Sequence, residues 1–472
     1  MKQFALHFLS LVSFFCVQAQ TRPVILKGKA PEYAGRKIEL KYQAEPVTGN
    51  AATVATISFL PDGSFESSVL INRTSYIFAT FDRWKAEIYL EPGSSYELVF
   101  PPYQALRESE KQNPYFRPEP IVFGLKNPSK TELNLQIDAF EQAYQQEENR
   151  YFDRIFKDKS TTAADSVITR LNKQFPADEQ SFFGQYKFYR LAAVRFAQRP
   201  EHNNSFIRQY LDRQPIPLDL PGWQHLFEQQ FTNFFFNESN RVGGDVFRSL
   251  VGTANLSGIE QYLQKEKRWS SPLGHMVILK SINDAYYQAR FNPKTMLALL
   301  HKIGQSNWPD HEKKIAKSLK EKLLYLTAGT AAPELTAQTI EGENFDLKNL
   351  HGKLVYLHFT TVTNPICRQH LDELKKDAQN LPGKVELVNL IPENNAAKRE
   401  LILQQNWPGT FVVVDDSDLE RYRVKAFPTA FLVAENGNLL LAPALNPIDG
   451  FPKQLSELLQ QRRTEQLRHQ PK

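Results

Sequence analysis

Hydrophobic residues follow three different patterns along this chain of 472 residues. From residue 21 to about residue 105, short apolar runs alternate with polar positions and are separated by turns rich in Pro, Gly and Asp. Ile57 and Phe59 precede the turn Pro61-Asp62-Gly63-Ser64 and Phe65 follows it, which predicts a pair of strands joined at this turn. Strands at this spacing predict a small antiparallel β-sandwich over residues 21–105.

The pattern changes twice in the middle of the chain. Residues 106–130 are rich in proline, which removes backbone donors, and we predict an irregular linker there. Apolar residues such as Ile137, Phe140 and Tyr144 then recur at helical spacing, so residues 131–328 are predicted to form an all-α domain. An aromatic cluster in this domain is interpreted as a helix-to-helix core rather than a groove for an apolar partner, and comprises Phe227, Phe231, Phe234, Phe235 and Phe236.

Strands and helices alternate in residues 333–472. The predicted strands are 354–359, 385–391, 411–414 and 430–433, the predicted helices are 365–381, 398–405 and a last one from about residue 452, and a hairpin through 435–438 leads into a strand at 439–441. Continuously apolar strands with intervening helices indicate a largely parallel sheet that is covered on both faces. The hairpin adds an antiparallel edge. The expected fold class is therefore multidomain, with a β-sandwich, an all-α domain and a C-terminal α/β domain.

Composition and the N-terminus limit the possible functions. A formal net charge of +5 is small for this length, and without a basic block it argues against nucleic-acid binding. An apolar run from Phe4 to Val17 follows Lys2 and ends near Ala19, which predicts a signal peptide over residues 1–19. We therefore expect export to the periplasm or cell envelope, with lipoprotein anchoring through Cys16 as a minor alternative. No later segment is apolar enough to be expected to span a membrane.

The strand and helix start between residues 354 and 368 carry the candidate chemistry. The segment reads Leu-Val-Tyr-Leu-His-Phe-Thr-Thr-Val-Thr-Asn-Pro-Ile-Cys-Arg, with Asn364 and Cys367 at the predicted helix start. This segment resembles the TlpA-like branch of the thioredoxin family, periplasmic thiol-disulfide proteins whose hallmark is Trp-Cys-x-x-Cys at this turn. Asn364 stands at the position of the attacking cysteine, so the nucleophile position is degenerate, and Cys367 matches the second, resolving cysteine. The sequence has two cysteines, and loss of the leader would leave Cys367 alone. The resemblance implies a thioredoxin-like fold for residues 333–472.

Both residues also have ordinary structural interpretations. Asn364 is a favourable N-cap and Pro365 suits the first helical position. Cys367 begins an apolar stripe that continues through Leu371 and Leu374, which predicts a buried thiol with a raised pKa and little reactivity.

The resemblance assigns roles to further residues. His358 occupies the position of a buried carboxylate in many thioredoxins, so it is the proton-relay candidate. Pro428 matches the family's cis-proline loop, and with Phe427 and Thr429 it would form a peptide-binding loop. Cys367, His370 and His358 fall short of a closed metal site, and neither a metal nor another cofactor is predicted.

Three functions remain open. The first is an exported thioredoxin-like protein that has lost dithiol chemistry and binds protein or peptide partners in the periplasm, or assists folding. The alternative is a thiol-disulfide oxidoreductase that works through the single thiol of Cys367. The third is a structural component of the cell envelope.

Overall fold

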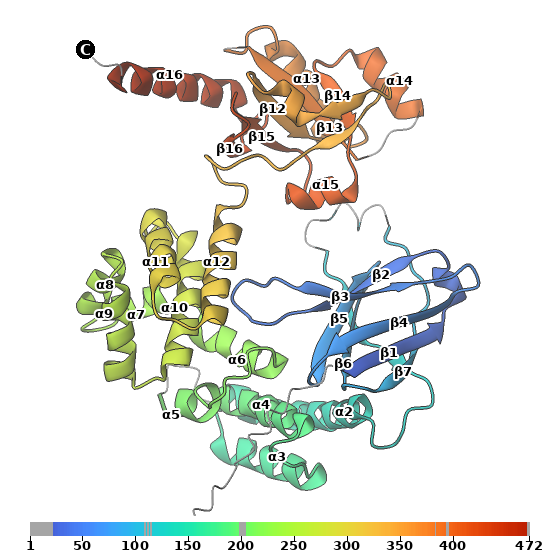
Figure 1. Cartoon of the computed structure of the whole chain (residues 1–472), viewed down its shortest axis with the longest axis vertical. Coiled ribbons are helices and arrows are strands. Elements are labelled where there is room, and N and C mark those ends of the chain that lie inside the picture. Colours follow the sequence, from blue (N-terminus) through green and yellow to red (C-terminus); the bar gives the residue numbers. More distant parts are fainter. Residues whose placement is uncertain are drawn as a thin grey trace, which may run out of the picture. The chain divides into compact units, whose positions relative to one another are not determined.

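The computed structural model describes residues 22–107, 110, 113, 116–197, 204–382, 384–392 and 396–469. The predicted signal peptide lies outside these residues. The chain forms two compact units, of which the first contains residues 1–105 and 117–312 and the second contains residues 106–116 and 313–472. The β-sandwich and most of the helical region belong to the first unit (Figure 1).

Two sheets face each other in the sandwich. The first sheet has the strand order β4-β1-β7-β9 and the second has the order β3-β2-β5-β6-β8. The strands are β1 (Arg22–Lys29), β2 (Lys37–Tyr42), β3 (Ala52–Ser58), β4 (Ser64–Ile71), β5 (Ser75–Phe81), β6 (Trp84–Leu90), β7 (Ser95–Val99), β8 (Glu119–Val122) and β9 (Gly124–Leu125), with a 3-10 turn at Pro31–Tyr33. Most pairings are antiparallel, but β1 pairs with β7 and β6 pairs with β8 in parallel.

The turn at residues 61–64 connects the two sheets and does not close a ladder between its flanking strands. β3 pairs with β2 in one sheet, whereas β4 pairs with β1 in the other. Ile57, Phe59 and Phe65 are all buried in the core between the sheets. The alternation correctly predicted which side chains face inward, but the expected strand pair is split because each strand finds its partner in a different sheet.

Residues 106–130, expected as an irregular linker, contain the short strands β8 and β9. β8 lies at the edge of its sheet and pairs with β6, with Pro120 opposite Lys85. A proline is tolerated there because an edge strand has one side without ladder hydrogen bonds. β9 pairs with β7 at the edge of the other sheet.

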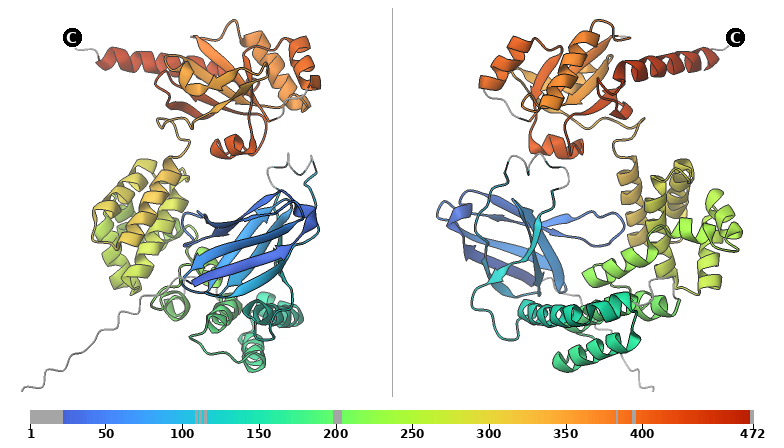
Figure 2. Two further views of the ribbon diagram at one scale, coloured as in Figure 1. Left: turned by 45° about the vertical axis from the view of Figure 1, so that its right-hand side comes forward. Right: turned by 180° about the vertical axis from the view of Figure 1, so that it is seen from behind.

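The helical region packs against the sandwich. Its helices are α2 (Leu133–Phe152), α3 (Thr161–Gln174), α4 (Phe182–Phe196), α5 (Asn204–Phe206), α6 (Pro221–Phe231), α7 (Phe234–Asn240), α8 (Asp245–Gly252), α9 (Leu256–Tyr262), α10 (Ser271–Tyr286), α11 (Pro293–Gln305) and α12 (Asp310–Leu324), with π-helical turns at Asp153–Lys157, Ile207–Leu211 and Leu263–Lys267. Asn134 of α2 exchanges hydrogen bonds with the backbone of Tyr89 on β6, and the Tyr89 ring lies 5.3 Å from the ring of Phe182 on α4. The teal helices of this region lie beside the blue strands of the sandwich in both views of Figure 2.

The aromatic cluster forms helical core, as the sequence indicated. Four of its rings are fully buried, and they belong to Phe227, Phe231, Phe234 and Phe235. Phe231 and Phe234 pack on the ring of Trp269 at 5.3 and 5.5 Å. Among the described residues, no helix is long and apolar enough to cross a membrane.

The second unit is built on one mixed sheet with the strand order β11-β10-β14-β13-β12-β15-β16. Its strands are β10 (Thr336–Thr339), β11 (Asn344–Asp346), β12 (Leu354–Phe359), β13 (Val385–Ile391), β14 (Thr410–Val413), β15 (Thr429–Val433) and β16 (Leu439–Ala444), and its helices are α13 (Pro365–Asp377), α14 (Ala396–Gln405), α15 (Asp416–Arg421) and α16 (Phe451–His469), with a 3-10 turn at Leu347–Leu350. β12, β13 and β14 are parallel, whereas β15 and β16 are antiparallel additions.

The central strand β12 is buried along its whole length. Val355, Leu357 and Phe359 face one core, whereas Tyr356 faces another that includes Phe451 of α16. Both faces of the sheet are therefore covered, as the continuous apolar run predicted. Because side chains alternate along a strand, His358 shares the face of Tyr356.

Candidate functional site

The candidate site lies where β12 ends and α13 begins. Asn364 is the N-cap of α13, and its side-chain oxygen accepts a hydrogen bond of 2.8 Å from the backbone amide of Ile366. Pro365 occupies the first helical position, where its missing N–H leaves no helical hydrogen bond unmade. The structure confirms the predicted cap, and an amide side chain cannot attack a disulfide.

Cys367 lies on the buried side of α13. Cys367 is 0% exposed. The next residues of the stripe, Leu371 and Leu374, are 0% and 1% exposed. Burial raises the pKa of the Cys367 thiol, although hydrogen bonds from the Thr361 backbone and the Thr360 side chain act in the opposite direction. The thiol is therefore protonated at neutral pH, and the nucleophilic thiolate is scarce.

His358 is fully buried in a neutral environment. Burial lowers the pKa of His358 to about 4, and the hydrogen bond to Asn389 opposes this change only in part. His358 Nδ1 lies 3.1 Å from Asn389 Oδ1, while Asn389 Nδ2 donates to the carbonyl of Pro408. The amide orientation makes His358 Nδ1 the donor, so the remaining ring nitrogen is a bare acceptor. That atom, Nε2, is buried without a hydrogen-bond partner among the described residues.

Asn389 is a site neighbour that sequence reasoning missed. It lies directly opposite His358 in the parallel pairing of β12 and β13. The signal in the sequence was one polar residue inside the otherwise apolar stretch Val388–Ile391. The structure buries Asn389 completely. His358 pairs with Asn389, whereas Thr361 and Thr360 lie beside the Cys367 thiol, so the predicted proton exchange between His358 and Cys367 stays a prediction.

The loop predicted to bind peptides borders the same end of the sheet. The Phe427–Pro428 peptide bond is cis. Thr429 begins β15 and lies opposite Phe359, the last residue of β12, which leads into the turn at Asn364. The Thr429 hydroxyl donates to the carbonyl of Ala426 at 2.6 Å, and Phe427 packs against the core of this domain.

Exposed apolar side chains lie beside the degenerate position. Ile366 is 58% exposed and directly follows the Asn-Pro cap. His370, one turn later on α13, is buried, and its Nδ1 accepts a hydrogen bond from the backbone amide of Ile448, whose side chain is 50% exposed. Burial lowers the pKa of His370. Ile366 on α13 and Ile448, which is tied to α13 through His370, are therefore both exposed apolar residues.

A metal site does not assemble from the three side chains considered above. Among the described residues, no group of three or more His, Cys, Asp and Glu side chains is arranged to hold a metal ion. The groups that this arrangement offers are a protonated thiol at Cys367, a neutral imidazole at His358 and the exposed apolar side chains of Ile366 and Ile448.

Comparison with known proteins supports the assignment of the C-terminal part. Residues 328–441 match the family model described as "AhpC/TSA family". No curated protein matches the chain. The match leaves the sandwich and most of the helical region unassigned.

Solved structures of low sequence identity resemble this part of the chain. The thioredoxin domain of a thiol-disulfide oxidoreductase from Bacteroides vulgatus is 20% identical, with 28% of this chain and 96% of that chain covered and a TM-score of 0.25. StoA from Bacillus subtilis is 24% identical, with 28% and 98% covered and a TM-score of 0.24. The pneumococcal exposed lipoprotein thioredoxin Etrx1 from Streptococcus pneumoniae is 18% identical, with 26% and 99% covered and a TM-score of 0.23.

The strand order and the family match agree with the resemblance noted in the sequence. Residues 328–441 therefore match the AhpC/TSA family model and have the thioredoxin-like fold that the segment around Asn364 and Cys367 led us to expect.

Proposed function

We propose that the chain is an exported protein of the cell envelope whose thioredoxin-like domain binds protein or peptide partners without dithiol exchange. The observation that carries this proposal is the pairing of a filled helix cap at Asn364 with a fully buried thiol at Cys367. Exchange through two neighbouring thiols requires a first thiolate at the helix start, and an asparagine stands there.

The proposed binding surface surrounds the start of α13. Ile366 and Ile448 offer exposed apolar area, and the loop of Phe427, Pro428 and Thr429 borders the same end of the sheet. An extended peptide could use apolar contacts for affinity and the loop backbone for hydrogen bonds. Two of the structures named above are the thioredoxin domain of a thiol-disulfide oxidoreductase and a lipoprotein thioredoxin, and a partner-binding role would retain such a fold while omitting dithiol chemistry.

A binding experiment tests this surface. We would measure fluorescence anisotropy of a labelled, unstructured peptide containing apolar residues, with the full chain and two variants. Ile366→Lys is expected to weaken binding by about 10-fold or more, because it places a charge in the apolar surface. Leu403→Lys is the matched control, because Leu403 is 71% exposed on α14 of the same unit. Equal binding by all three proteins would contradict the proposed surface.

The alternative is an oxidoreductase that works through Cys367 alone. It requires a thiol that reagents can reach in the folded protein. We expect a thiol reagent to label Cys367 slowly in the native protein and rapidly in denaturant, and insulin reduction to be equally absent in the natural chain and Cys367→Ser. Rapid native labelling together with turnover that Cys367→Ser abolishes would establish the alternative and remove our proposal.

A further inference from the structure

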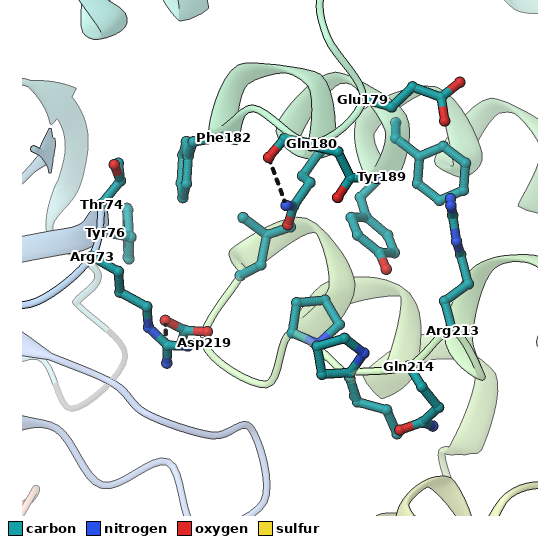
Figure 3. A pocket seen from close by; sticks show the side chains of 16 residues that line it. Arg73, Thr74, Tyr76, Glu179, Gln180, Phe182, Tyr189, Arg213, Gln214 and Asp219 are labelled. Atoms are coloured by element: carbon teal, nitrogen blue, oxygen red, sulfur yellow. Dashed lines mark hydrogen bonds and ion pairs between the residues drawn. The ribbon is translucent and has the colours of Figure 1, made fainter. Parts of the chain in front are cut away.

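A cavity of about 510 Å³ opens in the first unit, far along the chain from the thioredoxin-like domain. The turn between β4 and β5, the start of α4 and the segment 213–220 supply its walls (Figure 3). Its volume falls in the range of about 300–1,000 Å³ that small-molecule sites occupy. The sequence analysis did not anticipate it, because its residues come from three separate parts of the chain.

One side of this cavity is electrostatically neutral. Arg73 forms an ion pair with Asp219 at 2.9 Å, and the Tyr42 hydroxyl donates to the same carboxylate at 3.0 Å. Figure 3 shows this Arg73–Asp219 pair beside Thr74 and Tyr76. Asp219 is thus already satisfied by groups of the protein and does not call for a cationic ligand.

The opposite side carries a cation that is not neutralised. The guanidinium carbon of Arg213 lies 4.6 Å from the centroid of the Phe188 ring. Within the described part of the chain, neither Arg213 nor Glu179, the second acid that lines the cavity, is joined to an opposite charge within 4.0 Å. Arg213 is exposed, and a guanidinium that packs on a ring can still donate from N–H groups that match the two oxygens of a carboxylate.

The remaining walls combine apolar rings with the amide side chains of Gln180, Gln185 and Gln214. Phe182, Tyr189, Pro215 and Pro217 line the space between the two sides. The two prolines have no backbone N–H to offer, so they present ring surface rather than donors. An apolar body fits between these walls, with its charged group directed at Arg213.

We propose that this cavity binds a ligand that carries one carboxylate on an apolar, ring-sized body. A monoanion fits better than a phosphate dianion, because one unpaired guanidinium is available and the carboxylate of Glu179 lines the same cavity. The ligand could be a free organic acid or the C-terminal residue of a peptide. This inference is independent of the function proposed for the second unit, since all of its residues lie in the first.

The test compares acids with their neutral amides on the full chain. The probes are 3-phenylpropionate and 3-phenylpropionamide for a free acid, and acetyl-Gly-Phe with a free or an amidated C-terminus for a peptide. Titrations followed by calorimetry or ligand-observed NMR should show at least about 10-fold tighter binding of an acid than of its amide, since a charge-assisted bidentate contact is lost in the amide. Saturable binding of the free acid identifies a small molecule, whereas binding of the peptide acid alone identifies a C-terminus.

Variants assign the preference to Arg213. Arg213→Gln should abolish the preference for the acid, and Arg213→Lys should retain part of it. Arg290→Gln is the matched control, because Arg290 also stacks on a ring, Phe236 at 4.4 Å, but does not line the cavity. Circular dichroism would verify that the variants fold. The proposal is overturned if no probe saturates, if acid and amide bind equally to the natural chain, or if Arg213→Gln keeps the preference.

Discussion

The side-chain oxygen of Asn364 and the backbone amide of Ile366 are joined by a hydrogen bond of 2.8 Å that closes the first turn of α13. This bond occupies the place where a thioredoxin-like dithiol site would hold its attacking thiolate. The helix start is therefore stabilised by ordinary capping.

Removal of this cap should destabilise the second unit. Asn364→Ala is expected to lower its free energy of unfolding by about 1 kcal/mol, because the amide of Ile366 loses its acceptor. Asn364→Asp should be close to neutral, since a carboxylate also caps and interacts favourably with the helix dipole. Urea unfolding of the three proteins measures this difference. Equal stability of the natural chain and Asn364→Ala would show that the cap contributes little.

Restoring a thiol at the first position tests whether the geometry of the site persists. Asn364→Cys places a second sulfur at the helix N-terminus, one turn from Cys367, where the helix dipole lowers the thiol pKa. We expect this variant to gain a two-electron redox couple, measured by equilibration in glutathione buffers. Asn364→Cys combined with Cys367→Ser is the control and should show none. If Asn364→Cys shows no redox couple, the backbone of the turn does not hold positions 364 and 367 close enough for a disulfide.

The buried His358 should make stability dependent on pH. Its folded pKa of about 4 lies below the ordinary value of 6.5, so on acidification the unfolded chain takes up the proton first. The contribution of neutral His358 to the free energy of unfolding is therefore complete above about pH 6.5. As the pH falls to 4, this contribution decreases by about 3 kcal/mol. His358→Gln should remove this component from the pH profile of unfolding. NMR titration of the imidazole would give a midpoint far below 6.5, and an ordinary midpoint would contradict the prediction.

His275 should act in the opposite direction in the first unit. Its ring stacks on Trp308 at 3.8 Å, and its Nδ1 lies 2.5 Å from a carboxylate oxygen of Glu312. Burial acts to lower the pKa of His275, but hydrogen bonds with Glu260 and Glu312 outweigh it and raise the pKa. The stabilisation that protonated His275 contributes is therefore complete below about pH 6.5 and is lost as the pH rises through the folded pKa of His275.

A substitution isolates that contribution. Glu312→Gln is expected to destabilise the first unit by about 1–3 kcal/mol at pH 6 and by less at pH 9, because it removes a buried charge-assisted hydrogen bond. His301→Gln alters an exposed histidine and should leave the profile unchanged. Thermal unfolding over this pH range makes the comparison, and a pH-independent loss would contradict the role of His275.

Two glycines with the same backbone conformation should differ in their tolerance of a side chain. Gly409 has φ +92° and Gly352 has φ +89°. A Cβ at Gly409 would lie 2.4 Å from the carbonyl oxygen of Leu387, whereas nothing lies within 4 Å at Gly352. Gly352→Ala should cost about 1–2 kcal/mol for the left-handed backbone alone, and Gly409→Ala should cost clearly more. Similar midpoints in urea would show that β13 and β14 separate easily at this point.

Local patterns predicted the secondary structure well. β12 and β13 have the predicted bounds, and α13 begins at Pro365 as its cap required, although it ends at Asp377 and not at residue 381. The stripe that starts at Cys367 is buried as expected. These features follow from side-chain periodicity and capping, which act between residues close together in the sequence.

The pairing of strands that are distant in the sequence was harder to predict. The strands on either side of the turn at residues 61–64 lie in different sheets, and Pro120 lies in an edge strand where a linker was expected. Asn389 faces His358 only because two parallel strands adopt one register. Periodicity shows which face of a strand is buried, but it does not specify the neighbouring strand.

The sequence by itself determined that Asn364 would cap a helix and that Cys367 would lie on an apolar face. The tertiary structure alone decided that the acceptor nitrogen of His358 is buried without a partner, that His275 lies between Trp308 and two carboxylates, and that Arg213 shares a cavity with a neutralised Arg73–Asp219 pair. The physical reason is that caps and stripes depend on neighbouring residues in the chain. Burial, electrostatic pairing and cavities depend instead on which distant segments pack together.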